Sequence, residues 1–257
     1  METIGNIGGN NTAERLGLAQ LYSKRITPTA SWSDMGSSDH FVQFYESDAY
    51  IVNSVAEYII HGLKAGETCI VAATGEHLFE MERIIDSLST GLDSAKNEGR
   101  YIALDAEETL AKFMVNGMPD ENLFSNAVTE KVEKAVSYGR RVRVFGEMVG
   151  VLARQQNYAA AIRLEDLWNG MRKNNDFSLF CAYPMSELSH STASQQMTHI
   201  CNGHSRVIPD ETYTSLSTTD ERLRAIAVLQ QRSRQLQAEV ADLEHRIAVK
   251  HGVLQPV

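Results

Sequence analysis

The sequence predicts an α/β fold in which a mainly parallel β-sheet is flanked by helices and followed by a C-terminal coiled-coil helix. Short apolar runs rich in β-branched residues alternate with helical patterns, as right-handed βαβ crossovers require. A heptad repeat near the C-terminus indicates the coiled coil. The 257 residues are enough for one large α/β domain and a tail.

The central strand is predicted at residues 141–148, an apolar run that ends on Gly146 and Glu147. Such a run is typical of a parallel strand covered on both faces. Similar runs predict strands at residues 40–46, 67–73, 101–104 and 177–183. In the first of these, the strand period of two places Phe41 and Tyr45 on one face.

Helical patterns separate these strands, at residues 49–63, 76–88, 107–115, 121–138 and 159–173. The period of about 3.6 residues and the Gly residues at the helix ends support these predictions. Residues 91–99 and 116–120 are predicted to be a loop and a turn. Residues 199–209 could add a strand at the edge of the sheet.

Composition divides the chain into four parts. Residues 1–38 are rich in Gly, Asn, Ser and Thr and are predicted to be a flexible leader, in which residues 13–24 could form a short helix. Residues 39–210 form the main domain, and residues 211–220 form a linker. Residues 221–250 are predicted to form the coiled-coil helix, and a coiled coil of this kind indicates a homodimer.

The heptad seam of this helix holds apolar residues at nearly every position. Its members are Ile226, Leu229, Ser233, Leu236, Val240, Leu243 and Ile247. About three heptads is the lower limit for a coiled coil, and the polar Ser233 weakens the seam. The alternative is a single helix that packs back on the domain.

Charge and composition exclude several classes of protein. The chain has 24 basic and 33 acidic residues, a net charge of −9, which argues against direct binding of nucleic acid or an anionic membrane. No apolar run approaches the roughly 18 residues of a membrane span, and no signal pattern opens the sequence. Three scattered cysteines do not form a disulfide scaffold, so the cytoplasm is the expected compartment.

A phosphate-binding loop is expected to be absent. The turn after residues 67–73 is Thr74-Gly75-Glu76-His77, which lacks the Lys that holds phosphates in a P-loop. Glu76 also places negative charge where phosphate would bind. No Gly-x-Ser-x-Gly elbow or Ser/His/Asp order indicates a nucleophile. We therefore expect no enzyme of the usual nucleotide-hydrolysing type.

Glu147 is the main candidate for chemistry or recognition, because ligands of open α/β sheets bind beyond the carboxyl ends of the strands. It could be a base or a ligand-binding acceptor. The alternatives are an ion pair with Arg141, Arg143 or Arg163, or a helix cap. Trp168 and Tyr183 are candidate pocket residues with a polar group on an apolar ring, although core packing is the alternative for any single aromatic.

A metal site is not expected. His190, His199, Cys201 and His204 lie close in sequence, and Cys201-x-x-His204 has plausible zinc spacing. A closed zinc site needs four ligands, however, and no second Cys/His pair lies at a fixed offset. Cys69 and Cys181 lie inside apolar strands and are predicted to be small core residues.

Six stretches together resemble one protein family, the MEDS domain, a sensory domain named after methanogens, methylotrophs and a dichloromethane-responsive regulator. The stretches are HFVQFYE (40–46), GLKAGE (62–67), FGEM (145–148), AIRLEDLWN (161–169), FSLFCAYP (177–184) and HSRVIP (204–209). The resemblance implies a RecA-like core, similar to the KaiC ATPases, and a sensory role. This family is usually fused to a histidine kinase or a DNA-binding output.

The resemblance supplies candidate ligand-binding residues but no catalytic set. The matching positions are His40, Gln43, Tyr45, Glu147, Glu165, Trp168 and Tyr183. The leading hypothesis is a cytoplasmic sensory module that binds a small molecule at the strand carboxyl ends. Its C-terminal coil would signal to a separate protein, such as a histidine kinase or a transcription regulator.

Two alternatives remain open at this point. One is a nucleotide-binding or nucleotide-hydrolysing RecA-like enzyme with a degenerate P-loop, in which Glu147 is the base. The other is a ligand-free scaffold that sequesters a kinase or a transcription regulator.

Overall fold

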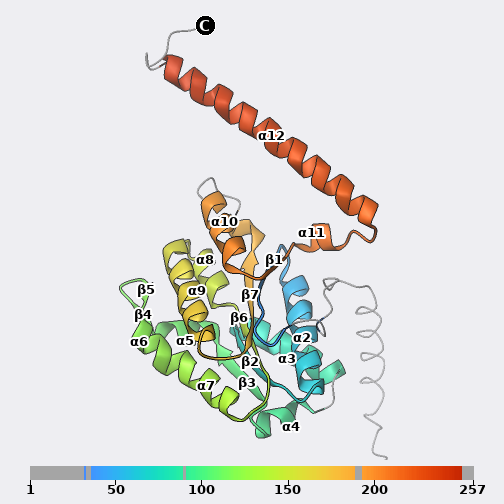
Figure 1. Ribbon diagram of the computed structural model, residues 1–257, viewed down its shortest axis with the longest axis vertical. Helices are drawn as coiled ribbons and strands as arrows, with labels where there is room; N and C mark the ends of the chain where they lie inside the picture. The colour runs from blue at the N-terminus through green and yellow to red at the C-terminus, as the bar shows by residue number, and fades with distance from the viewer. Residues whose placement is uncertain (1–31, 33–35, 89–90, 189–192, 251–257) are drawn as a thin grey trace, which may run out of the picture. The chain divides into compact units, whose positions relative to one another are not determined.

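The computed structural model describes residues 32, 36–88, 91–188 and 193–250, and a six-stranded parallel sheet forms its centre (Figure 1). The strands are β1 (His40–Tyr45), β2 (Thr68–Ala73), β3 (Tyr101–Asp105), β6 (Val142–Gly146), β7 (Ser178–Pro184) and β8 (Arg206–Ile208). Their order across the sheet is β3-β2-β6-β7-β1-β8, and all neighbours pair in parallel. The predicted mainly parallel α/β sheet is confirmed.

Helices cover both faces of this sheet. One face packs against α2 (Asp48–Lys64), α3 (Gly75–Leu88) and α4 (Leu92–Asn97). The other packs against α5 (Ala106–Ala111), α7 (Glu130–Ser137), α8 (Met148–Arg154), α9 (Tyr158–Arg172) and α10 (Ala193–Gly203). Every residue of β1, β2, β6 and β7 is therefore buried, which explains why these strands read as nearly continuous apolar runs.

Alternation along β1 separates two hydrophobic cores. Phe41 and Tyr45 pack with α2 on one face, whereas Val42 and Phe44 pack on the face covered by α8 and α9. The predicted division of this strand is confirmed. It follows that His40, in register with Val42, lies on the face of α9.

One predicted helix is shorter than expected. The pattern at residues 107–115 ends as α5 at Ala111, because an antiparallel hairpin follows. The hairpin strands are β4 (Met114–Val115) and β5 (Met118–Pro119). Asn116 and Gly117 have φ angles of 51° and 79°, which are the left-handed conformations that a two-residue type I′ turn requires.

Two other segments depart from the prediction. The expected loop at residues 91–99 contains α4, a helix of six residues that buries Leu92 and Ala95. The expected single helix at residues 121–138 consists of three pieces. They are α6 (Glu121–Phe124), a π-helical turn (Ser125–Thr129) and α7. A helix of six residues is too short for its periodicity to be visible in the sequence.

The segment after β7 is also more ordered than expected. It forms α10, and only Arg206–Ile208 of the predicted edge strand pairs with β1. Residues 211–214 of the predicted linker form α11 (Glu211–Thr214), where the Glu211 carboxylate accepts the backbone N–H groups of Glu46 and Ser47. The predicted leader, including residues 13–24, lies almost entirely outside the described residues.

Helix α8 packs on β7 with no room for a side chain at Gly150. A Cβ atom there would lie 2.8 Å from the carbonyl oxygen of Ala182. This oxygen belongs to a strand held on both sides by β6 and β1, so it cannot move away easily.

Gly150→Ala is therefore expected to lower the free energy of unfolding by about 1–3 kcal/mol through overpacking. Gly170→Ala is the matched control, because Gly170 is also helical and its Cβ would meet no atom within 4 Å. The control should gain up to about 1 kcal/mol from helix propensity. Urea denaturation followed by circular dichroism measures both. Equal stabilities would contradict the tight α8–β7 contact.

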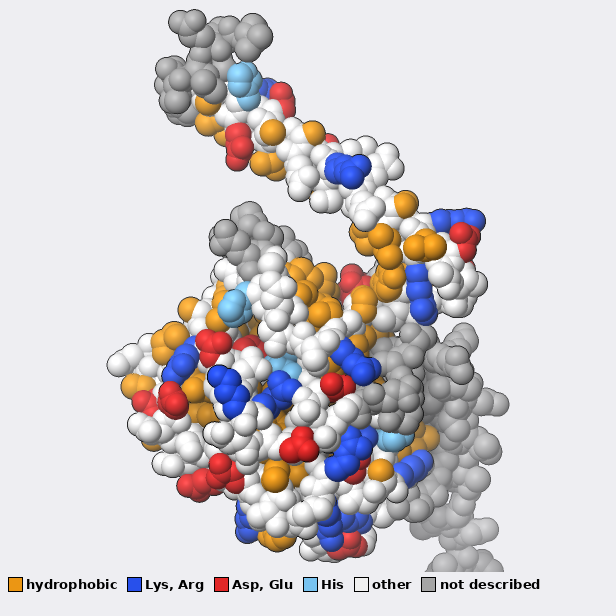
Figure 2. Space-filling view, viewed as in Figure 1, with side chains coloured by type: hydrophobic (Ala, Val, Ile, Leu, Met, Phe, Trp, Pro, Cys, Tyr) orange, Lys and Arg blue, Asp and Glu red, His pale blue; other side chains and the backbone are white. Residues whose placement is uncertain are grey.

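The second compact unit, residues 215–257, is described up to Lys250 and consists mainly of α12 (Thr219–Lys250). The helix starts with a capping box. Thr218 Oγ1 accepts the N–H of Glu221, and the Glu221 carboxylate accepts the N–H of Thr218. Apolar side chains follow the helix along its length (Figure 2). The exposed seam residues include Leu229, Leu236, Val240, Leu243 and Ile247.

Candidate functional site

At the carboxyl edge of the sheet, Glu147 is enclosed by polar partners. Its side chain is 0% exposed. The carboxylate accepts hydrogen bonds from the Thr74 backbone N–H (3.1 Å), His77 Nδ1 (2.9 Å) and Arg154 Nη1 (3.0 Å). Arg154 also donates to the Tyr45 hydroxyl. Glu147 is thus an ion-pair partner, but of His77 and Arg154 and not of the arginines that the sequence suggested.

Glu147 and His77 hold each other charged. Burial would raise the pKa of Glu147, but the hydrogen bond from His77 and the charges of His77 and Arg154 outweigh it, so the pKa falls below its ordinary 4.5. Burial would likewise lower the pKa of His77. The bond to Glu147 and the charges of Glu147 and Asp48 raise it above 6.5.

These shifts set a pH window for the pair. Because the pKa of His77 is raised on folding, its contribution is complete below pH 6.5 and is lost as the pH rises through the folded-state pKa. Because the pKa of Glu147 is lowered, its contribution is complete above pH 4.5 and is lost as the pH falls through the folded-state pKa. The pair therefore stabilises the fold most between pH 4.5 and pH 6.5.

His77→Gln tests this window. The variant should be less stable than the wild type by about 1.5–3 kcal/mol inside the window, where a charge-assisted hydrogen bond is lost. The difference should shrink as the pH rises through the folded-state pKa of His77, which lies above 6.5. Urea denaturation at a series of pH values from the window upward gives the differences. A difference that does not change with pH would show that His77 is not charged in the folded protein.

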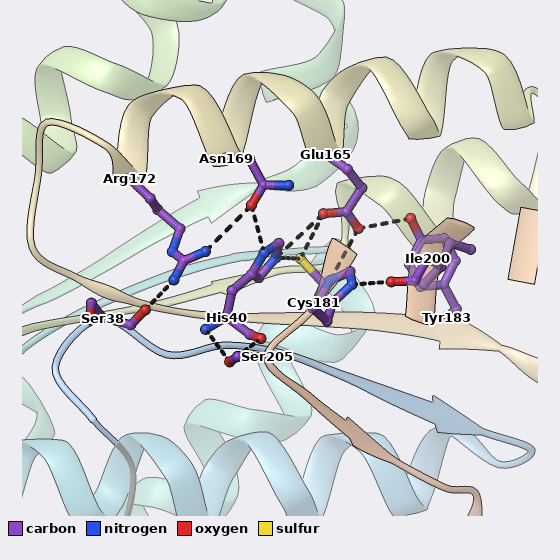
Figure 3. A network of polar contacts seen from close by, with 10 residues as sticks. Ser38, His40, Glu165, Asn169, Arg172, Cys181, Tyr183, Ile200 and Ser205 are labelled. Carbon is purple, nitrogen blue, oxygen red and sulfur yellow. Dashed lines mark hydrogen bonds and ion pairs between the residues drawn. The ribbon is translucent and has the colours of Figure 1, made fainter. Parts of the chain in front are cut away.

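A second polar cluster lies on the face of the sheet that α9 covers. It joins His40 of β1, Glu165 of α9, and Cys181 and Tyr183 of β7 (Figure 3). His204, the residue after α10, completes it. His40 Nε2 lies 3.4 Å from both Glu165 Oε2 and Cys181 Sγ. The Tyr183 hydroxyl donates to Glu165 Oε1 (2.9 Å), and His204 Nε2 lies 3.6 Å from the same oxygen.

Helix periodicity and strand pairing bring these residues together. On α9, Glu165, Asn169 and Arg172 follow one another at spacings of four and three and so share one face. Asn169 Oδ1 lies 3.0 Å from His40 Nδ1 and accepts from Arg172. The pairing of Val42 with Cys181 places β1 and β7 side by side below this face.

A cavity of about 220 Å³ opens beside the cluster, between α9 and the end of α10. Its lining consists of Glu165, Asp166, Asn169, His199, Ile200, Asn202, Gly203 and His204. Glu165 and His204 belong to both the cavity and the buried cluster. The cavity therefore gives access to groups that are otherwise enclosed.

The seven candidate residues do not form one site at the strand carboxyl ends. Tyr45 and Glu147 lie together at that edge. His40 lies at the amino end of β1 and contacts Glu165, which the Tyr183 hydroxyl also contacts. The remaining two candidates, Gln43 and Trp168, lie elsewhere.

Gln43 lies on the α2 side of the sheet, where its amide donates to Ser54. Trp168 packs edge-to-face against Phe124 and Phe177, at centroid distances of 5.4 and 6.3 Å, inside the hydrophobic core. Neither residue lines the cavity. The structure thus divides the candidates among four places.

Sequence reasoning missed Cys181, which it placed among the small core residues. The thiol is buried but contacts His40 and Glu165. His204 was considered only with its sequence neighbours His190, His199 and Cys201. Cys201 lies on α10 and is not part of the cluster, and His190 lies outside the described residues. The available signals were His40, a titratable residue that opens a mostly apolar strand, and the family resemblance, which marked Glu165 and Tyr183.

The domain is thus a parallel α/β fold with a buried polar cluster beside a small cavity. The family model of MEDS, described as the methanogen/methylotroph, DcmR sensory domain, matches residues 39–202. The chain belongs to this family, as its motifs predicted.

The chain was also compared with solved structures and with curated proteins. A KaiC-like protein from the hyperthermophilic archaeon Pyrococcus horikoshii OT3 matches with a TM-score of 0.47 and 13% sequence identity, over 67% of this chain and 73% of that chain. No curated protein matches the sequence. Among the described residues, no helix has both the length and the apolar character needed to cross a membrane.

Proposed function

We propose that this chain is a cytoplasmic signal-transduction module that binds a small molecule in the cavity between α9 and α10. The family match supports a sensory role. The observation that carries the location is the cavity itself, because it combines an apolar residue, Ile200, with polar groups that converge on Glu165 and His204. Small-ligand sites generally have this mixture.

We favour this cavity over a ligand site at the carboxyl ends of the strands. At that edge, the Glu147 carboxylate accepts hydrogen bonds from Thr74, His77 and Arg154, its partners among the described residues. A ligand there would have to displace an internal ion pair. The α9–α10 cavity requires no such exchange.

A cavity-filling variant tests this location. Gly203 lines the cavity and a Cβ there meets no atom within 4 Å, so Gly203→Phe should fill the space without strain. Gly170→Phe is the control, since Gly170 is equally open but outside the cavity. Native mass spectrometry of protein from its own host should find an organic molecule on the wild type and the control only. Retention by Gly203→Phe would place the ligand elsewhere.

The output is proposed to pass through α12, which pairs with a second copy and contacts a separate signalling protein. Its exposed apolar seam supports this proposal. Apolar residues in heptad register, such as Leu236 and Val240, do not stabilise a single helix while they are exposed to water, but they stabilise a coiled coil. Ligand binding would change the signal only if the ligand has different affinities for the module in the two states of the coil.

Leu236→Asp is expected to abolish the dimer, because it places charge in the middle of the seam. Gln231→Asp adds the same charge away from the seam and should have no effect. Light scattering after size-exclusion chromatography should give twice the chain mass of 28.6 kDa for the wild type and the control. Leu236→Asp should give the single-chain mass. A wild-type monomer would contradict the coil.

We also propose that the chain does not hydrolyse nucleotides. In support, the Glu147 carboxylate already accepts the Thr74 N–H at the start of α3, where a P-loop would bind phosphate. Sustained ATP or GTP turnover by the pure wild type, lost in Glu147→Gln, would overturn this proposal. A stoichiometric protein partner without any retained small molecule would favour the scaffold instead.

A further inference from the structure

We propose that His40, Glu165, Cys181 and His204 bind one divalent transition-metal ion, with zinc as the best match, at the floor of the cavity. The inference rests on the proposed ligand-binding cavity and specifies what lies at its inner end. It goes beyond the sequence, which predicted no metal site.

The donor atoms have the spacing of a tetrahedral metal site. His40 Nε2, a carboxylate oxygen of Glu165, Cys181 Sγ and His204 Nε2 all lie within 4.8 Å of one another. His40 Nε2 lies 3.4 Å from Cys181 Sγ, and Glu165 Oε2 lies 3.4 Å from His40 Nε2 and 3.7 Å from Cys181 Sγ. The other carboxylate oxygen, Oε1, lies 3.6 Å from His204 Nε2. Zinc–ligand bonds of 2.0–2.3 Å in tetrahedral geometry separate the ligand atoms by roughly 3.3–3.8 Å.

His204 presents an unprotonated nitrogen to the cluster. Its Nδ1 lies 2.6 Å from the backbone carbonyl oxygen of Ile200, which can only accept, so Nδ1 carries the hydrogen. The Nε2 lone pair then faces Glu165 Oε1 without a hydrogen bond, although the side chain is only 1% exposed.

His40 is oriented in the same way. Asn169 Oδ1 accepts from Arg172, which fixes the orientation of the amide, and the same oxygen lies 3.0 Å from His40 Nδ1. His40 therefore donates from Nδ1 and directs Nε2 at Glu165 and Cys181. A histidine that ligates a metal usually donates its other ring N–H to an oxygen in this manner.

The charges of the cluster also fit a dication. Among the described residues, the ion-pair contacts of the buried Glu165 are with the two histidines, His40 and His204. A divalent ion with one carboxylate, one thiolate and two neutral imidazoles gives a net charge of zero. Burying a neutral assembly costs far less than burying an isolated carboxylate.

The donor set favours zinc over harder cations. Nitrogen and thiolate ligands select zinc and related transition metals, whereas magnesium and calcium take oxygen ligands. Four protein ligands would close a tetrahedral site. Binding would transfer the Cys181 thiol proton to solvent, since the metal ligand is the thiolate.

A bound ion would join four segments that are distant in the sequence. They are the first residue of β1, the middle of α9, the middle of β7 and the residue that follows α10. Because α10 contributes Ile200, Asn202 and Gly203 to the cavity, metal occupancy would hold the cavity wall in place. Metal binding is thereby linked to ligand binding in the same module.

Cobalt(II) titration of the metal-depleted full chain tests the site. The wild type should bind one ion and show a thiolate-to-cobalt charge-transfer absorption. Cys181→Ser should lose this absorption and weaken zinc binding by more than about 100-fold. Cys201→Ser is the matched control, because Cys201 lies on neighbouring α10 but outside the cluster, and it should behave as the wild type.

Two further measurements distinguish loss of the metal site from unfolding of the variant and from loss of the organic ligand. Circular dichroism should show that Cys181→Ser remains folded, and zinc should raise the melting temperature of the wild type but not of this variant. Gly203→Phe should keep the cobalt absorption even though it loses the organic ligand. If the wild type binds no cobalt or zinc, or if Cys181→Ser and Cys201→Ser bind equally, the metal proposal is wrong and the cavity proposal still stands.

Discussion

Replacing Glu147 with alanine is expected to lower the free energy of unfolding by about 3–5 kcal/mol, as removal of one partner from a buried charge pair usually does. The carboxylate is fully buried and receives hydrogen bonds from Thr74, His77 and Arg154. Its loss leaves a buried backbone N–H and a histidine without an acceptor. Urea denaturation near pH 6, inside the window set by the pair, gives the largest difference.

Two controls identify the cause of this loss. Glu147→Gln keeps the shape and an acceptor oxygen but not the charge, so its loss should be smaller. Asp166→Ala removes an exposed carboxylate on α9 and should change stability by less than about 0.5 kcal/mol. If Glu147→Ala were as stable as the wild type, Glu147 would be available for a ligand, as the sequence alone suggested.

Trp168→Ala should have an effect of similar size, about 3–5 kcal/mol, because it leaves a cavity in the core. The indole is 1% exposed and packs edge-to-face between Phe124 and Phe177. Thermal and urea denaturation report the loss of stability, and near-ultraviolet circular dichroism reports the loss of aromatic packing.

Trp168→Phe is the appropriate comparison, since it keeps an aromatic ring and should cost much less. Both variants should retain the small molecule found on the wild type under conditions where they are folded. A stable Trp168→Ala variant that loses this molecule would contradict the core assignment and return Trp168 to a binding site.

The strands were predictable because burial on two faces leaves a strong mark in the sequence. The run Thr68–Ala73 has apolar or small residues throughout, and the alternation along β1 separates Phe41 from Val42. The short helix α4 was not predictable, since its burial depends on only Leu92 and Ala95. Local periodicity needs about three turns to be recognised.

The polar cluster was only partly predictable, for a different physical reason. Its members come from four segments, and only the strand pairing of β1 with β7 and the packing of α9 bring them together. The sequence marked His40, Glu165 and Tyr183 as candidates but not their contact with Cys181. A cysteine inside an apolar strand is predicted to be a core residue, because the sequence does not show which side chains contact its sulfur.

The most direct test of the account is a crystal structure of the full chain purified from its own host, with anomalous diffraction recorded at the zinc edge. We expect an anomalous peak between His40, Glu165, Cys181 and His204, and density for a small molecule between α9 and α10. A nucleotide bound at the Thr74–Gly75 turn, with both of these positions empty, would contradict the account.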